Sequence, residues 1–242
     1  MRPNLAILKT FLRDTCGAVT VEYVILAAAV TGMGIASTDV IRNGMGTLAG
    51  TVDGELRGTS TDEVVGLSYA DSFDNGANGW SGAIASEMEG VGHVLGPIGG
   101  SGGQPSVSRT FDIDPAASKA TFEFDLLAMD SLDKESGIIY IGGIEVGKVT
   151  GDHGTPTFTA AEGLPDGVII RATTLDKDVQ LGGSDRYNDS ITGIQISVAQ
   201  DKDAPLGQLT FGFGSTANQH TDDESFAIDN FRATGLRDPN KS

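Results

Sequence analysis

The stretch Ala120-Thr121-Phe122-Glu123-Phe124-Asp125-Leu126 alternates apolar and polar side chains at every step. A period of two places the apolar side chains on one face of a β-strand and the polar ones on the other. The run Val107-Ser108-Arg109-Thr110-Phe111-Asp112-Ile113 shows the same pattern. Further short apolar runs predict strands at 137–141, 168–173, 191–198, 208–213 and 226–233.

Turn sequences separate these runs, at Asp74-Asn75-Gly76, Gly142-Gly143, Pro165-Asp166-Gly167 and Gly182-Gly183. Glycine accounts for 34 of 242 residues, which is about 14% against roughly 7% in an average protein. The glycines follow no Gly-X-Y period, which excludes collagen. Many short strands without a convincing helix predict a mainly-β antiparallel sandwich of the jelly-roll type over residues 67–238.

The chain is strongly acidic, with 33 Asp and Glu against 16 Lys and Arg and a net charge of −17. Such a charge repels nucleic acid and anionic lipid, so nucleic-acid binding is not expected. Residues 1–17 are the exception, because three bases (Arg2, Lys9, Arg13) against Asp14 give +2. A basic head, an apolar run and an acidic body are typical of a chain handled by a membrane export system.

The apolar run covers residues 18–38, and its only charged side chain is Glu22. As a helix it would span roughly 30 Å, the thickness of a bilayer core. It can be a permanent anchor, a secretory signal cleaved between Ala36 and Ser37, or a helix that waits in the membrane before assembling elsewhere. Glu22 favours the last interpretation, because an acid in a membrane helix costs about 2–3 kcal/mol at the helix centre and usually has a dedicated partner.

The residues Arg13-Asp14-Thr15-Cys16-Gly17-Ala18-Val19-Thr20-Val21-Glu22-Tyr23 resemble the N-terminus of type IVb pilins of the Flp/Tad class. The resemblance implies that prepilin peptidase cuts between Gly17 and Ala18 and leaves the helix in place. It further implies that Glu22 and Tyr23 serve assembly with other pilin subunits, where the carboxylate can neutralise a neighbour's new terminal amine. Pilins of this class are often very short, so the long continuation implies a minor pilin or pseudopilin.

Four segments follow from these patterns: a basic leader at 1–17, a hydrophobic pilin-like helix at 18–48, a linker at 49–66 and the β-sandwich domain at 67–238. The linker prediction rests on its spaced glycines and on the polar run 59–63. The expected location is the inner membrane before assembly, then an extracellular filament or the cell surface.

A second resemblance concerns both ends of the sandwich domain. The stretch Asp71–Ser81 resembles the opening of bacterial carbohydrate-binding or laminin-G-like jelly rolls, and Phe226–Gly235 resembles their closing strand. The resemblance implies surface glycans as ligands and a structural Ca²⁺ near the first strand. If the first and last strands are neighbours, Asp71, Asp74 and Asp229 are its candidate ligands, with solvated turn acids as the alternative. The acidic turn of Asp130, Asp133 and Glu135 also resembles secreted bacterial modules.

Catalytic signals are weak, and no enzyme activity is expected. The three histidines, His93, His153 and His220, lie far apart in the sequence, so a zinc site is not expected. The Gly-rich run 96–103 lacks the Lys-Ser/Thr of a phosphate-binding loop and is interpreted as a mobile connection. Trp80 is expected in the core rather than as a sugar platform. The run 222–224 is interpreted as an exposed loop.

The leading functional hypothesis is a pilin-like subunit whose sandwich head serves adhesion. One alternative is a secreted lectin-like protein released by signal peptidase after Ala36. The other is an extracellular enzyme that acts on polysaccharide. Glycan identity and filament partners do not follow from the sequence.

Overall fold

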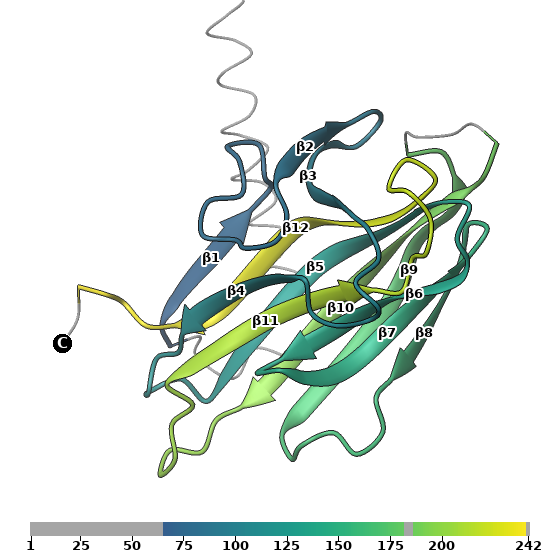
Figure 1. The fold of residues 1–242 in the computed structure, drawn as a ribbon. Helices are drawn as coiled ribbons and strands as arrows, with labels where there is room; N and C mark the ends of the chain where they lie inside the picture. Colours follow the sequence, from purple (N-terminus) through teal and green to yellow (C-terminus); the bar gives the residue numbers. More distant parts are fainter. Residues whose placement is uncertain (1–64, 182–185, 241–242) are drawn as a thin grey trace, which may run out of the picture. The chain divides into compact units, whose positions relative to one another are not determined.

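The computed structural model describes residues 65–181 and 186–240, which form two antiparallel sheets packed face to face (Figure 1). The predicted leader 1–17, the predicted helix 18–48 and the linker up to residue 64 lie outside the described residues. Within the described part of the chain, no helix has the length and apolarity needed to cross a membrane.

One sheet has seven strands, and its order is β2 (Ala85–Met88), β3 (Gly92–Ile98), β12 (Glu224–Leu236), β5 (Lys119–Asp130), β10 (Asp189–Ala199) and β9 (Val168–Val179), with β1 (Leu67–Asp71) also paired to β12. The other sheet has five strands, in the order β4 (Val107–Asp112), β11 (Gln208–Ser215), β6 (Asp133–Ile141), β7 (Ile144–Asp152) and β8 (Thr155–Ala160). The chain changes sheet at each step from β3 to β6, again between β8 and β9, and at each step from β10 to β12. Each sheet therefore combines segments that are distant in sequence.

These sheets confirm the predicted antiparallel sandwich, and all seven predicted runs lie in strands. Five of the twelve strands, β1, β2, β3, β7 and β8, lie outside the predicted runs. In β7 the apolar alternation is hidden because glycines occupy two inward positions. A Cβ on Gly147 would meet the Phe158 ring at 3.0 Å, and one on Gly151 would meet Leu132 at 2.8 Å. Large side chains of neighbouring segments fill the space that an apolar side chain of β7 would otherwise occupy.

The core between the sheets is centred on Phe231 of β12, which is fully buried. Its ring lies 4.8–6.4 Å from six other aromatic rings, those of Tyr69, Trp80, Phe111, Phe122, Phe124 and Phe211. Trp80 is only 8% exposed, which confirms its predicted place in the core. Aromatic pairs contribute about 0.5–1.5 kcal/mol each beyond area burial, so this cluster ties both sheets together.

Two predictions about loops were wrong. Gly96–Ile98 belongs to β3, and the segment after it is held on β11 by hydrogen bonds from the Ser101 and Gly103 amides to the Ser215 carbonyl, at 2.8 and 3.0 Å. The interpretation of 96–103 as a mobile connection is therefore incorrect. Glu224, predicted in an exposed loop, is fully buried and opens β12. Its acidic neighbour Asp222 is exposed as expected.

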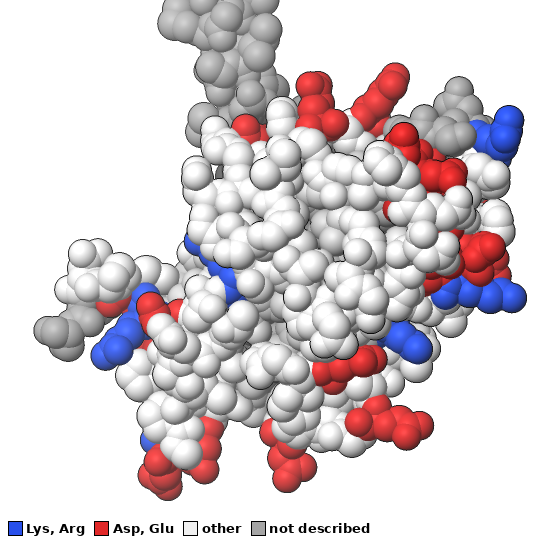
Figure 2. Space-filling view, viewed as in Figure 1, with Lys and Arg blue, Asp and Glu red and all other residues white. Residues whose placement is uncertain are grey.

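Charge is distributed unevenly over the surface. Figure 2 shows acidic side chains around the margin of one face, while the middle, over β11, is largely white and a basic group lies to its left, near β4. By register the outward positions there include Thr110, Thr210, Gly212 and Tyr140.

Candidate functional site

The outer face of the seven-stranded sheet carries a line of polar side chains that crosses four adjacent strands. Arg232 of β12 pairs with Glu123 of β5, Glu123 pairs with Gln195 of β10, and Gln195 pairs with Arg171 of β9. We call these four residues the polar row. Strands lie about 4.8 Å apart, so the polar row extends over roughly 15 Å.

The neighbours of the polar row along each strand point into the core. Phe122 and Phe124 flank Glu123, and Ile194 and Ile196 flank Gln195, and all four are buried. Because successive side chains of a strand point to opposite faces, Glu123 and Gln195 face outward. The Gln195 side-chain amide donates to Glu123 Oε1 at 2.6 Å, which fixes the middle of the row.

Two carboxylates form the next pair along β12 and β5, because Asp229 pairs with Asp125. We call them the carboxylate pair. Burial raises the pKa of Asp125, while a 2.9 Å hydrogen bond from the Asn230 side chain and the charge of Arg232 lower it. The pKa of Asp229 is raised to about 6, mainly by burial and to a smaller extent by the negative charges of Asp125 and Asp74, against the lowering effect of the Asn230 amide.

A local irregularity of β12 creates this arrangement. The register shifts between Asp229 and Arg232, and Asn230 has a φ of 51°, in the left-handed region. An extra residue in a strand re-aims the side chains on either side of it. Asp229 and Arg232 therefore both lie beside outward-facing residues of β5, while Phe231 enters the core.

The polar row and the carboxylate pair together supply guanidinium and amide donors beside amide and carboxylate acceptors. Aliphatic side chains flank them on β9, where Ile169 is 53% and Leu175 is 55% exposed. Leu175 lies over Gly193, 3.2 Å from where a Cβ would be. Such a surface can hydrogen-bond hydroxyl groups and contact the C–H faces of a ligand.

The predicted calcium ligands have different partners in the structure. β1 does pair with β12, so the first and last strands are neighbours. The Asp71 carboxylate accepts hydrogen bonds from the Phe73 amide at 2.9 Å, from Trp80 Nε1 at 3.3 Å and from the Tyr69 hydroxyl. These hydrogen bonds join the Asp71 carboxylate to its near neighbours Tyr69, Phe73 and Trp80.

The other two predicted ligands, Asp74 and Asp229, interact with each other through their negative charges. Asp74 is exposed and lies 3.5 Å from His93 Nδ1, and its charge contributes to the raised pKa of Asp229. Calcium binding by Asp71, Asp74 and Asp229 stays a prediction. The processing and assembly residues, Gly17, Ala18, Glu22 and Tyr23, lie outside the described residues.

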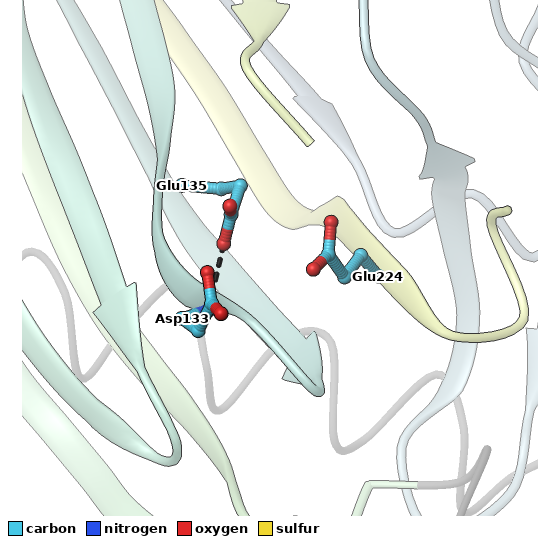
Figure 3. A group of neighbouring side chains, drawn as sticks. All are labelled: Asp133, Glu135 and Glu224. Carbon is cyan, nitrogen blue, oxygen red and sulfur yellow. Dashed lines mark hydrogen bonds between the residues drawn. The ribbon is translucent and has the colours of Figure 1, made fainter. Parts of the chain in front are cut away.

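A further acidic group lies where β6 and β12 begin. Ligand atoms of Asp133, Glu135 and Glu224 lie within 4.8 Å of one another, and Figure 3 shows their carboxylates close together. Such a group can hold a cation, but amides already supply hydrogen bonds. The Asp133 amide and the Asn218 side chain donate to Glu135, and the amides of Asn218 and Gln219 donate to Glu224.

These hydrogen bonds give the group a structural role, which is to tie the turn at 218–219 to both sheets. The sequence indicated an acidic turn containing Asp133 and Glu135, but it missed Glu224. It also missed the polar row, although the alternation around Glu123 had indicated an outward polar side chain there. No local signal links Glu123 to Arg171 or Arg232, because pairing decides that contact.

The fold and the site define the class of protein: an antiparallel two-sheet β-sandwich with a polar outer sheet face. No protein-family model matches the chain, and no curated protein matches its sequence.

Among solved structures, it is similar to the sugar-binding C-terminal domain of EclA, with 6% identity, a TM-score of 0.31 and coverage of 71% of this chain and 79% of the other. It is also similar to the CBM2 module of the evolved Dit of Lactobacillus casei BL23 phage J-1, with 11% identity, a TM-score of 0.34 and coverage of 73% and 99%. At TM-scores this low, neither similarity establishes a shared ligand.

Proposed function

We propose that the β-sandwich is a non-catalytic head that binds glycans through the polar row and the adjacent carboxylate pair. The polar row is the observation that carries this proposal, because it aligns donors and acceptors of both charges across four strands. An extended line suits a chain of sugar rings, whereas compact small molecules prefer enclosed pockets. The aliphatic side chains of Ile169 and Leu175 add contact surface beside it.

Glycan binding can be tested with the full-length protein on a panel of immobilised polysaccharides. We expect Glu123→Ala and Gln195→Ala each to weaken binding about fivefold, because a hydrogen bond contributes about 1 kcal/mol and about 1.4 kcal/mol corresponds to tenfold. Thr157→Ala is the matched control, because Thr157 is exposed on β8 of the other sheet. Equal affinity of the polar-row variants and the wild type would contradict the proposal.

Glycan hydrolysis is the second candidate function, and the carboxylate pair is the observation that favours it. Glycoside hydrolysis uses two carboxyl groups, one of which holds a proton at a raised pKa. Asp229, with a pKa of about 6 beside Asp125, has that property. Release of reducing sugar ends from a bound polysaccharide, abolished by Asp229→Asn, would favour the enzyme over the binding head.

We also propose that the N-terminal segment presents the head at the cell surface as a pilin-like subunit. The spacing of Gly17, Glu22 and Tyr23 supports this part of the proposal. Prepilin peptidase and other pilin subunits are then partners, and the inner membrane holds the chain before assembly. The rival remains a secreted lectin-like protein cut after Ala36.

A further inference from the structure

A pocket of about 220 Å³ opens on the seven-stranded sheet, between the β2–β3 hairpin and the loop that precedes β12. Four apolar side chains contribute to its lining, namely Met88, Pro97, Met129 and Leu181. Met129 and Leu181 are buried in an apolar cluster separate from the main core, and Met88 packs against that cluster. The lining is therefore an apolar surface fixed by the sheet itself.

Carboxylates surround this apolar surface. Glu87 and Glu89 come from the β2–β3 hairpin and Asp222 comes from the loop before β12, and all three are exposed. Among the described residues that line the pocket, none is Lys, Arg or His. The local field at the mouth is thus negative and favours a cationic group.

The size of the pocket restricts what can enter it. Its volume of about 220 Å³ lies below the roughly 300–1,000 Å³ typical of sites for drug-sized ligands. A single long side chain fits a volume of about 220 Å³ better than an oligosaccharide does. Lys and Arg bury an aliphatic stem along apolar surface while the charged head stays at a polar rim, which matches the methionines below and the carboxylates above.

We propose that this pocket is a docking site for a basic segment of a partner protein, with one Lys or Arg side chain inserted. The stem packs on Met88 and Met129, and the cation pairs with Glu87, Glu89 or Asp222. The site is distinct from the polar row, because Met129 lies six residues from Glu123 along β5, roughly 20 Å at about 3.4 Å per residue. The proposal does not depend on glycan binding.

The test is an NMR titration of the full-length protein with capped nonapeptides that differ only at the central residue, which is Lys, Arg, norleucine or acetyl-lysine. We expect the Lys and Arg peptides to shift the amide resonances of residues 87–89 and 129, and to do so less as salt is added. The norleucine and acetyl-lysine peptides keep the stem without the charge, and they should bind at least fivefold more weakly. Equal binding of all four peptides, or no binding of the Lys and Arg peptides, overturns the proposal.

Two double variants with the same change in net charge separate the pocket from general acidity. Glu87→Gln with Glu89→Gln should weaken binding of the Lys peptide at least fivefold. Glu145→Gln with Glu162→Gln, both at exposed positions outside the pocket, should leave it unchanged. An equal loss in both double variants overturns the site. Polysaccharide binding should survive in both, which distinguishes failure of this site from failure of the glycan proposal.

Discussion

Asp229 is buried on the outward side of β12 beside a second carboxylate, Asp125. Burial and the neighbouring negative charge make the ionised form of Asp229 unfavourable. The pKa of Asp229 is about 6 in the folded protein, against a reference value of 3.8. Between these values the folded state binds the proton more tightly than the unfolded chain does. The folded protein therefore loses stability as the pH rises from about 4 to about 6.

Asp229→Asn should remove this loss, because the neutral amide oxygen can still accept the hydrogen bond from the Asn230 amide. In buffer with chelator, we expect the variant to have a higher Tm than the wild type near pH 7.5 and a similar Tm near pH 4. Thermal unfolding at the two pH values measures this. Asp166→Asn, in an exposed turn, is the control. A lower Tm of Asp229→Asn at both pH values would contradict the argument.

Added Ca²⁺ provides a second test, because it should change the Tm of the wild type if the predicted calcium site exists. If Asp229 helps to hold the predicted structural ion with Asp74, added Ca²⁺ should raise the Tm of the wild type and not that of Asp229→Asn. An unchanged wild-type Tm would count against the predicted calcium site.

At the scale of elements, β12 connects the core of the sandwich with the candidate site on its outer face. It pairs with β1, β3 and β5, and it carries Glu224, Asp229, Phe231 and Arg232. Its inward side supplies the ring at the centre of the core, and its outward side supplies part of the polar row. The irregularity at Asn230 allows both functions within three residues.

Phe231→Ala should therefore destabilise the sandwich by about 3–5 kcal/mol, the usual cost of removing a buried aromatic ring. Denaturant unfolding of the purified protein measures this loss. Ile84→Ala is the comparison, because Ile84 is 75% exposed and its loss should change the free energy of unfolding by less than about 0.5 kcal/mol. A cost below about 1 kcal/mol for Phe231→Ala would mean that the ring cluster does not hold the sheets together.

At the scale of the whole molecule, the acidic sandwich follows a short basic head and an uncharged run interrupted only by Glu22. Under the proposed pilin-like function, we expect the protein recovered from cells to begin at Ala18, because the pattern around Gly17 resembles that of a prepilin. Mass spectrometry of the first peptide identifies the start. A start at Ser37 would instead identify a secreted protein released by signal peptidase.

A variant of the processing position gives the matching control. Gly17→Leu should block cleavage before Ala18 and leave the leader attached, while the sandwich itself is unchanged. Processing that continues unchanged in this variant would exclude prepilin peptidase as the protease.

The sequence alone determined seven of the twelve strands and the sides on which their residues lie. The alternation around Phe122 and Glu123 is a local property with a period of two, so it specifies an inward ring and an outward carboxylate without any partner strand. The predicted place of Trp80 in the core is confirmed, and β1 lies beside β12, which was the condition for the predicted calcium ligands. The alternation fails in β7, which has glycines where neighbouring side chains fill the core.

Only the tertiary structure decided which outward side chains meet. Arg171 lies 48 positions after Glu123 in the sequence, and Arg232 lies a further 61 positions on. They align because β9, β10, β5 and β12 pair side by side in one sheet. Register depends on the packing of the whole buried face, since a slip by one residue would turn every side chain to the other side. The same long-range packing placed Glu224 beside Glu135. It also built the pocket from the β2–β3 hairpin, the end of β5, the residue Leu181 after β9 and the segment around the start of β12, which carry no common sequence signal.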